Sequence, residues 1–295
     1  MPPSLAIVGP TASGKSALAL AYARAAADVE LVSADAMQVY RGMDLGTAKP
    51  TPAELAEVPH HLIDIAEPGD DFSLARFVEL GRAAIADIEA RGKRALVVGG
   101  TGLYVRGLVD DLEVPGQFPE VRAELDADED TSALHRRLAE LDPLAASRME
   151  PTNRRRIVRA LEVTVGAGRR FSSFGPGLDS YPDIPTRLVG LDPPLDELDA
   201  RIEARVATML DAGLLDEVRG LQRSMARTAR QALGYKELLE HLESAVPLEE
   251  AILRIAGRTR RFARRQRRWF RRDPRIRWVP PDMSPSGLVR FLDAE

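Results

Sequence analysis

Cysteine is absent from the 295-residue chain, and histidine occurs only four times. Without cysteine there can be no disulfide and no thiolate metal site, and so few histidines argue against a histidine-rich metal cage. No apolar run approaches the length of a membrane span. The first apolar run begins at Leu5, which leaves no room for a signal peptide before it. We therefore expect a cytoplasmic protein that makes no use of a membrane.

Lysine is scarce too, since 37 of the 41 basic residues are arginine. The net charge of −4 hides a strong split along the chain. The segment from Arg254 to Arg277 holds twelve arginines and one acid, Asp273, so it carries +11 and leaves −15 on the rest. Arginine is preferred everywhere in this sequence, so only the clustering is informative. A basic segment on an acidic body is typical of proteins that bind a polyanion.

A complete phosphate-loop motif, GPTASGKS, stands near the start of the chain. The apolar run 5–8 before it reads as a buried strand, and the alanine- and leucine-rich run after it reads as a helix, which is the context the motif needs. Lys15 would neutralise phosphate oxygens, and the Ser16 hydroxyl would help to hold Mg²⁺. The predicted phosphate site comprises Gly9, Pro10, Thr11, Ala12, Ser13, Gly14, Lys15 and Ser16. The motif alone does not identify the phosphorylated ligand.

Strand and helix patterns alternate over the first part of the chain. Strands are predicted at 5–8, 30–35 and 95–98, and a helix at 74–90. Such alternation predicts an α/β fold with a parallel sheet and helices on both faces. Because ligands bind at the carboxyl ends of such strands, the loops 9–16, 34–40 and 99–104 should converge on one site.

The pattern changes after about residue 115, where short helices follow one another without a strand. We predict a core domain at 1–116, a helical insertion at 117–186, and a continuation of the core at 187–295. A strand is expected at 187–191, and long helices at 195–222 and 246–272.

Asp35 is the carboxylate that follows a predicted strand, and it precedes Gln38 and Tyr40. ATPases and GTPases usually place an acid at the end of a later strand, but the run ALVVGGTG ends in glycines and threonine instead. A carboxylate beside a phosphate loop suits a base that takes a proton from an acceptor. The loop would then hold a diphosphate leaving group while something other than water attacks. Asp35 could equally be a helix or turn cap.

Within the basic segment, arginines recur at helical spacing and form one stripe. A second face is mostly apolar and can dock on the core, with Ile252, Ile255, Phe262 and Trp269 on it. The stripe comprises Arg254, Arg258, Arg261, Arg265, Arg268 and Arg272. Because few acids stand nearby in the sequence, we expect this stripe to contact nucleic acid, mostly through phosphates.

The chain resembles the tRNA dimethylallyltransferase (tRNA isopentenyltransferase) family over essentially its whole length. The ordered segments that carry the resemblance are GPTASGKS, SADAMQVYRGMDLGTAKP, VPHHLIDI, LVVGGTGLY, RRRIVRALEV, QALGYKE and TRRFARRQRRWFRR. The resemblance implies an α/β core like that of P-loop nucleoside triphosphate hydrolases, with a small helical insertion. It also implies transfer of a dimethylallyl group from dimethylallyl diphosphate to N6 of the adenine 3′-adjacent to the anticodon, with Mg²⁺ as cofactor. The implied partner is the anticodon arm of tRNA, and we expect a monomer.

The family's functional positions can be carried over one residue at a time. Asp35 would be the general base and Thr101 a further residue of the catalytic site. The implied tRNA-binding residues are Asp35, Ala36, Met37, Gln38, Thr101, Arg122, Arg155, Arg156, Arg159, Gln231, Gly234, Tyr235, Lys236, Arg264, Arg265, Gln266, Arg267, Arg268 and Trp269. The family usually has serine where this chain has Ala36, so a hydrogen bond from this position to the nucleotide must come from the backbone.

Simpler interpretations stay open at several of these places. Thr101 could cap the next helix, and the loop 46–49 could donate to phosphate or be a plain turn. Arg201 and Arg205 are expected to be solvated or paired with Glu203 and its neighbours. Two other kinds of enzyme, a small-molecule kinase and a transferase acting on free adenine nucleotides, share the phosphate loop. A non-catalytic RNA-binding protein is a third alternative, against which the intact loop and Asp35 argue.

Overall fold

The computed structural model describes residues 4–110, 112–175, 177–244 and 246–293. The chain forms two compact units. Unit 1 comprises Met1–Asp111 and Asp183–Glu295, and unit 2 is Leu112–Pro182. None of the described helices is long and apolar enough to cross a membrane. The domain boundaries predicted at 117 and 186 stay a prediction.

Unit 1 is built on a six-stranded sheet in which every strand pair is parallel. In spatial order the strands are β3 (His60–His61), β2 (Val29–Ser33), β4 (Arg94–Gly99), β1 (Leu5–Val8), β5 (Arg187–Leu191) and β6 (Ile276–Val279). The predicted α/β class with a parallel sheet is therefore confirmed. The strands β1 and β2 are buried along their whole length, as expected of a parallel sheet covered on both faces.

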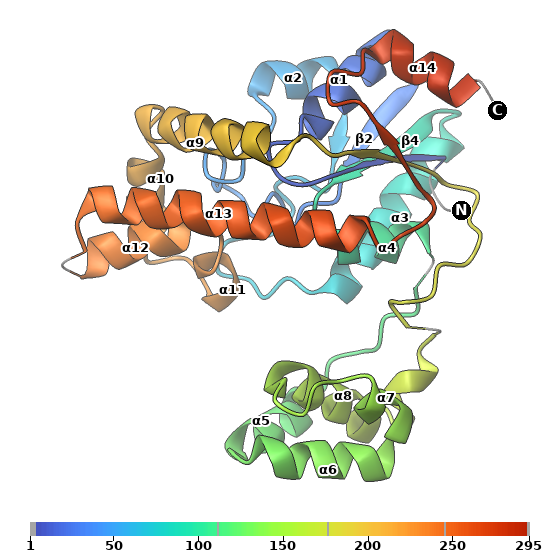
Figure 1. Cartoon of the computed structure of the whole chain (residues 1–295), viewed down its shortest axis with the longest axis vertical. Helices are drawn as coiled ribbons and strands as arrows, with labels where there is room; N and C mark the ends of the chain where they lie inside the picture. Colours follow the sequence, from blue (N-terminus) through green and yellow to red (C-terminus); the bar gives the residue numbers. More distant parts are fainter. Residues whose placement is uncertain (1–3, 111, 176, 245, 294–295) are drawn as a thin grey trace. The chain divides into compact units, whose positions relative to one another are not determined.

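Helices cover both faces of this sheet (Figure 1). On one face, α1 (Lys15–Ala25) and α14 (Pro285–Asp293) lie against each other, and α1 packs its apolar side chains on alternate strand residues such as Ile7 and Leu31. The helices α3 (Leu74–Ala90) and α4 (Gly102–Val109) contact β4. Alternation of strand side chains allows both faces to be buried. The short helix α2 (Pro52–Glu57) precedes β3.

A further layer of helices lies beyond the carboxyl ends of the strands. It consists of α9 (Leu195–Asp211), α10 (Leu214–Leu221), α11 (Arg227–Arg230), α12 (Tyr235–Glu243) and α13 (Leu248–Phe270). The long helices α9 and α13 run side by side (Figure 1). Their apolar residues pack with Tyr40 and Met43 into one cluster, so this layer is anchored on the segment that follows β2.

The helical segment predicted at 195–222 consists of two helices in the structure. The pattern predicted long helical structure over 195–222, and within it α9 ends at Asp211 and α10 begins at Leu214. Gly213 lies between them with φ of 100°, a left-handed conformation that favours glycine and ends a helix. The strands β3 and β6 were not predicted, because β3 has only two residues and β6, with the sequence IRWV, lacks the continuous apolar run of β1.

Unit 2 is entirely helical over its described residues apart from its loops. It contains α5 (Pro119–Ala127), α6 (Thr131–Leu141), α7 (Pro143–Ser147), α8 (Arg154–Gly166) and the short 3₁₀ helix η1 (Phe171–Ser173). Aliphatic side chains from α5 to α8, mostly leucine and alanine, form its core. Buried Asp142 caps α7 through the Ala145 N–H and also accepts hydrogen bonds from Ser172. Unit 2 therefore has a core of its own, separate from that of the sheet.

Candidate active site at the carboxyl ends of the central strands

The phosphate loop joins β1 to the start of α1. Gly14 takes a left-handed conformation with φ of 91° immediately before the helix, a conformation that glycine adopts readily. A side chain at Gly9 would come within 2.6 Å of the Leu191 carbonyl oxygen on β5. The first turn of α1 leaves N–H groups without helical partners, and Ser16 is exposed there. The loop therefore has the geometry of an anion site at a helix N-terminus.

Lys15 is the cation that the loop itself contributes. Its ammonium nitrogen donates to the Pro10 carbonyl at 3.1 Å. Shielding from water lowers the pKa of Lys15 to about 8, an effect that Asp35 opposes and Arg205 reinforces. Lys15 is thus a cation of the phosphate loop that also feels the charge of Asp35, and it binds an anion most strongly when it is protonated.

Arg201 and Arg205 of α9 also lie against the phosphate loop, contrary to the sequence-based expectation. Arg201 pairs with Glu197 and approaches the carbonyl oxygens of Ala12 and Ser13 at 3.5 and 3.4 Å. The Arg205 guanidinium donates to the Thr11 hydroxyl at 3.5 Å, and removal from water lowers its pKa. The sequence does place these two arginines four residues apart on one face of a helix. Only the fold shows that this face contacts the phosphate loop.

Glu203, the partner expected for these two arginines, pairs with Arg260 instead. One side of the helix α9 therefore contacts the phosphate loop, and another side contacts α13. Arg205 adds a second positive group to a loop that already has Lys15.

Asp35 follows β2 and is half-buried. One carboxylate oxygen accepts the Met37 N–H at 2.8 Å, so the predicted turn cap is present. The other oxygen has no hydrogen-bond partner among the described residues and stays available. A single carboxylate can therefore hold its own loop and still accept a proton.

Thr101 occupies the N-cap position of α4 but makes no side-chain cap there. Its hydroxyl instead accepts the Ala36 N–H at 3.2 Å. The interpretation of Thr101 as a helix cap is therefore wrong, and its side chain joins the loop after β4 to the loop that carries Asp35. Because the Ala36 N–H is occupied, only the carbonyl of that residue is left for a nucleotide.

Gln38 is held from both ends of its amide. Its oxygen accepts the Ser33 hydroxyl at 2.8 Å, and its nitrogen donates to the carbonyls of Thr47 and Ala48 at 3.1 and 3.2 Å. The amide oxygen keeps one lone pair for a further donor. The orientation of Gln38 thus depends on the loop 46–49.

The polar side chains of the loop 46–49 are bound to neighbouring groups of the protein. The Lys49 ammonium binds the Tyr40 carbonyl and the carboxylates of Asp44 and Asp64, and the Thr47 hydroxyl donates to the Met43 carbonyl. These contacts favour the plain turn over a phosphate site.

The predicted segment from Gln231 to Lys236 is divided between core and surface. Tyr235 is fully buried, and its hydroxyl donates to Glu217 at 2.5 Å. Gly234 is also buried, with its N–H bound to Glu237 at 2.8 Å. Gln231 is exposed and accepts a hydrogen bond from Lys236. Of the four residues predicted in this segment, Gln231 and Lys236 therefore have accessible side chains.

Several arginines of the basic helix α13 form ion pairs with acids of other segments. Arg264 pairs with Asp199, and Arg267 pairs with Asp192. Farther towards the start of the helix, Arg258 pairs with Glu237. Acids distant in the sequence therefore neutralise part of the cluster that looked unpaired along the chain.

Four arginines near the end of α13 remain exposed at helical spacing: Arg261, Arg265, Arg268 and Arg272. Arg265 and Arg268 have no ion-pair partner within the described part of the chain. Arg265 lies over the Phe262 ring at 5.2 Å. The basic stripe is thus shorter than predicted and concentrated in the second half of the helix.

Gln266 and Trp269 face inward from the same helix. Gln266 is buried and bridges the backbones of Thr11 and Gly100. Trp269 packs so closely on Gly102 that a methyl group there would lie 2.0 Å from its indole nitrogen. Both side chains contact the loops of the site, and Gln266 is too deeply buried to be available to a nucleic acid, whereas Trp269 is only half-buried.

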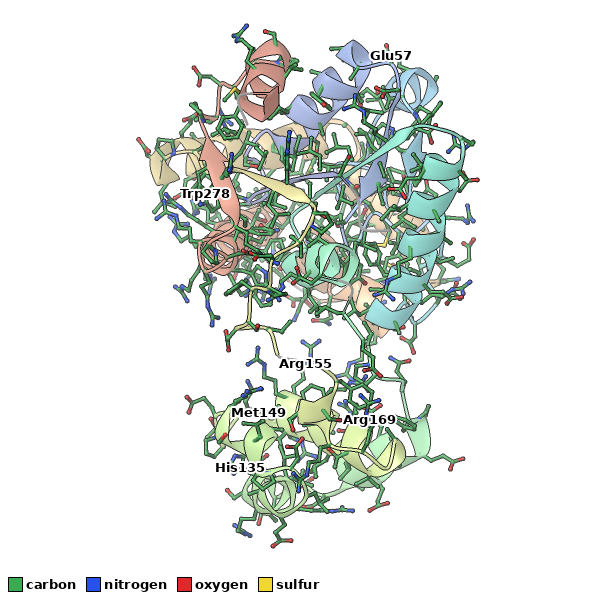
Figure 2. The ribbon with its side chains drawn as sticks, turned by 90° about the vertical axis from the view of Figure 1, so that its right-hand side faces the viewer. Glu57, His135, Met149, Arg155, Arg169 and Trp278 are labelled. Carbon is green, nitrogen blue, oxygen red and sulfur yellow. The ribbon has the colours of Figure 1, made fainter. Side chains whose placement is uncertain are left out.

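In unit 2, two predicted arginines are exposed and two are engaged. Arg155 and Arg156 are exposed at the start of α8, where Figure 2 shows Arg155 projecting from the helix. Arg122 pairs with Asp126, and Arg159 pairs with Glu162. Arg155 and Arg156 are thus the accessible positive groups of this predicted segment.

No group of three or more potential metal ligands of the His, Cys, Asp or Glu type occurs among the described residues. This does not conflict with Mg²⁺, which usually keeps several waters and takes only one or two protein ligands beside substrate phosphates. The exposed Ser16 hydroxyl fits such a site. The buried Ser13 hydroxyl of the same loop has no hydrogen-bond partner in the described structure.

The three loops predicted to converge do so. Thr101 binds Ala36, Gln266 binds both Thr11 and Gly100, and Lys15 is close enough to Asp35 for its pKa to respond. These loops follow β1, β2 and β4, which are neighbours in the sheet.

The chain matches the profile of the family described as IPP transferase over residues 38–273, and that described as isopentenyl transferase over residues 4–65. It is 51% identical to a tRNA dimethylallyltransferase of Kineococcus radiotolerans, over 98% of this chain and 94% of the relative. A tRNA dimethylallyltransferase of Anaeromyxobacter dehalogenans is 47% identical over 97% of this chain and 98% of the relative.

Solved structures show the same likeness. The full-length tRNA isopentenylpyrophosphate transferase of Bacillus halodurans is 38% identical, with a TM-score of 0.72 over 98% of this chain and 95% of that one. A eukaryotic dimethylallyltransferase crystallised acting on tRNA is 26% identical, with a TM-score of 0.83 over 99% of this chain and 79% of that one.

Proposed function

Because the chain belongs to the IPP transferase family and is a prenyltransferase, we propose that it transfers a dimethylallyl group from dimethylallyl diphosphate to tRNA. The acceptor is N6 of the adenine 3′-adjacent to the anticodon, and pyrophosphate is released. In this proposal the core is of the P-loop type. Assignment to the cytoplasm and to a monomer stays a prediction from the sequence.

The observation that carries the proposal is the meeting of a phosphate loop with a carboxylate that has one free oxygen. Lys15 and Arg205 supply positive charge at the loop, and Asp35 lies near Lys15 on the adjacent strand-end loop. A diphosphate and a proton donor bound at this site would face each other.

On the donor side, the loop from Gly9 to Ser16 binds the diphosphate. The positive N-terminus of α1 and the cations of Lys15 and Arg205 stabilise the negative charge that grows on the leaving group. As the bond between the allylic carbon and the diphosphate oxygen breaks, that electron pair stays with pyrophosphate. Because the protein stabilises the departing pyrophosphate, the allylic carbon becomes electron-poor and open to attack by the acceptor.

On the acceptor side, the adenine N6 forms the new bond to the allylic carbon. Asp35 accepts the proton that N6 loses, through the carboxylate oxygen that does not bind the Met37 N–H. The amide oxygen of Gln38 can accept a hydrogen bond from the base with its remaining lone pair. The bond to Thr101 keeps the backbone beside Asp35 in place.

Mg²⁺ would be held by the Ser16 hydroxyl together with oxygens of the diphosphate, and it would supply further neutralisation of the leaving group. The exposed hydroxyl at the first turn of α1 supports this assignment.

The tRNA is proposed to bind through exposed arginines of both units. Arg265 and Arg268 on α13, and Arg155 and Arg156 on α8, are exposed. Such groups bind phosphates and give affinity without sequence information. Specificity would come from a single-stranded loop whose bases can be splayed and read.

Parallel incubations test the proposal against its alternatives. The protein is given labelled dimethylallyl diphosphate with tRNA, the same donor with free adenine nucleotides, or ATP with common metabolites, each with Mg²⁺. The proposal predicts label in tRNA alone. Label in free nucleotides or phosphorylated metabolites would contradict it, and tRNA binding without any transfer would favour a non-catalytic RNA-binding protein.

A further inference from the structure

The helix α13 carries one buried amide amid its run of arginines. Gln266 is only 7% exposed, whereas Arg265 and Arg268 beside it are exposed. It shares its face with buried Ala263 and Phe270, three residues before and four after it. Gln266 therefore points into the protein from a helix whose other side is basic. A buried amide needs hydrogen-bond partners for both its oxygen and its nitrogen.

Both partners of Gln266 are backbone groups of the candidate active site. Its oxygen accepts the Thr11 N–H at 2.9 Å, and its nitrogen donates to the Gly100 carbonyl at 2.8 Å. Thr11 belongs to the phosphate loop after β1, and Gly100 to the loop after β4. One side chain thus bridges the two loops. It lies 255 residues from Thr11 and 166 residues from Gly100 in the sequence.

The glycines of the second loop allow this close approach. A methyl group at Gly100 would lie 2.4 Å from the Gln266 amide nitrogen, and one at Gly102 would lie 2.0 Å from the Trp269 indole nitrogen. Thr101 stands between these glycines and accepts the Ala36 N–H. The helix that holds the phosphate loop therefore also holds the residue that fixes the backbone beside Asp35.

We infer that Gln266 is a positioning residue for prenyl transfer, which sets the distance between the phosphate loop and the loop of Thr101. It contacts backbone only, so it acts through the two loops and not on the substrates. Because the Thr11 N–H is occupied by Gln266, the diphosphate must take its backbone donors from later in the phosphate loop. This inference rests on the proposed function, in which donor and acceptor meet between those loops.

The test replaces the amide without changing the size of the side chain much. Gln266→Met removes both hydrogen bonds and leaves the Thr11 N–H and the Gly100 carbonyl without their partner. Gln222→Met is the matched control, since Gln222 donates to Glu243 in the helical layer and touches neither loop. Melting temperature and circular dichroism are measured for both variants, so that a folding defect is seen directly.

The first measurement is steady-state prenyl transfer. For Gln266→Met we expect kcat to fall roughly 10- to 100-fold, because small misplacement of reacting groups slows a reaction by such factors. The dissociation constant for tRNA should change by less than about threefold, because Gln266 lies outside the proposed tRNA interface and the exposed arginines that bind phosphates are unchanged. The control should keep both values. A wild-type kcat in Gln266→Met would overturn the inference.

The second measurement does not require catalysis. Amide hydrogen exchange at Thr11 should be faster in Gln266→Met than in wild type and unchanged in Gln222→Met, because Gln266 supplies the acceptor for that N–H. Unchanged exchange would overturn the inference even if transfer were slow. If wild type transfers no prenyl group but the Thr11 exchange changes as expected, the proposed function fails and the bridging role of Gln266 stands.

A second variant keeps the test decisive if Gln266→Met does not fold. Gln266→Glu has the same shape and keeps an acceptor for the Thr11 N–H, but its ionised form sets an oxygen against the Gly100 carbonyl. We expect Thr11 to stay protected while kcat falls by a factor similar to that in Gln266→Met. A variant with wild-type kcat would show that the Gly100 bond has no part in the reaction and would contradict the inference.

Discussion

The Thr101 hydroxyl accepts the Ala36 N–H at 3.2 Å, which joins the loop after β4 to the loop that carries Asp35. Ala36 and Thr101 are 65 residues apart in the sequence. Their contact depends on the sheet order, in which β2 and β4 are neighbours and end at the same edge. The loop of Asp35, the proposed base, is therefore held in place by the uncharged side chain of Thr101.

Thr101→Val should lower kcat by about tenfold, because it leaves a donor without its acceptor at a cost of about 1–3 kcal/mol. Thr101→Ser keeps the hydroxyl and serves as the control, with a kcat close to wild type. Single-turnover transfer with saturating tRNA measures the effect. Equal rates in the two variants would mean that the hydroxyl does not position the Asp35 loop.

Asp35→Ala should slow the chemical step about 10²- to 10⁴-fold, the usual range for loss of a general base. Binding of tRNA should weaken far less, because the exposed arginines remain. Asp211→Asn removes an exposed carboxylate at the end of α9 and is the control. An unchanged single-turnover rate in Asp35→Ala would show that the proton goes elsewhere.

The charge on Lys15 should control diphosphate affinity near neutral pH. Its pKa is lowered to about 8, so above that pH the ammonium loses its proton and binds an anion less well. We expect the dissociation constant of inorganic pyrophosphate to rise by up to about tenfold per pH unit above pH 8. Calorimetry at several pH values measures it.

Lys15→Arg is the control for that titration, because arginine stays charged throughout the range. It also corrects for the titration of pyrophosphate itself. The two proteins should differ in slope above pH 8 and agree below it. Parallel curves would mean that Lys15 does not titrate there. The same lowered pKa should make the native state more stable as pH rises from about 8 towards 10.5, because the unfolded chain binds that proton more tightly.

Arg265→Gln combined with Arg268→Gln should weaken tRNA binding and reduce the slope of log affinity against log salt by about 1.5, since two phosphate contacts are lost. Arg254→Gln combined with Arg258→Gln is the control, because both arginines already pair with glutamates. Filter binding over a range of salt measures both. A slope that falls equally in the two double variants would place the tRNA along the whole helix.

The target adenine should leave its stack when tRNA binds, because a stacked base cannot bring N6 to an allylic carbon whose diphosphate lies on the phosphate loop. Extrusion of a base costs a few kcal/mol. A fluorescent adenine analogue at the target position should brighten on binding even without dimethylallyl diphosphate. A signal that stays quenched until the donor is added would show that the donor assembles the pocket.

The sequence predicted the parts of the site that local patterns determine. The strand β1 and the phosphate loop were readable because an apolar run, a glycine-rich loop and a helix follow one another within twenty residues. Asp35 was recognisable as a carboxylate at a strand end. The resemblance to a known family added the identity of the donor and the acceptor, which no periodicity contains.

Contacts between distant segments could not be predicted in this way. Arg264 looked free because its partner Asp199 lies 65 residues away, and Arg205 looked solvated because only the packing of α9 shows what it meets. Tyr235 looked accessible although it lies in the core. The spacing of Gln266 from Ala263 and Phe270 does indicate that it lies on the buried face of α13. Its two hydrogen-bond partners could not be predicted, because they belong to loops that meet only in the fold.

One measurement tests the account most directly. Unmodified tRNA is incubated with dimethylallyl diphosphate, Mg²⁺ and either the wild-type chain or Asp35→Asn, and the product is digested and mapped by mass spectrometry. The account predicts a dimethylallyl group on N6 of the adenine 3′-adjacent to the anticodon with wild type, and almost none with Asp35→Asn. Modification at another nucleotide, no modification by wild type, or equal modification by the two proteins would contradict it.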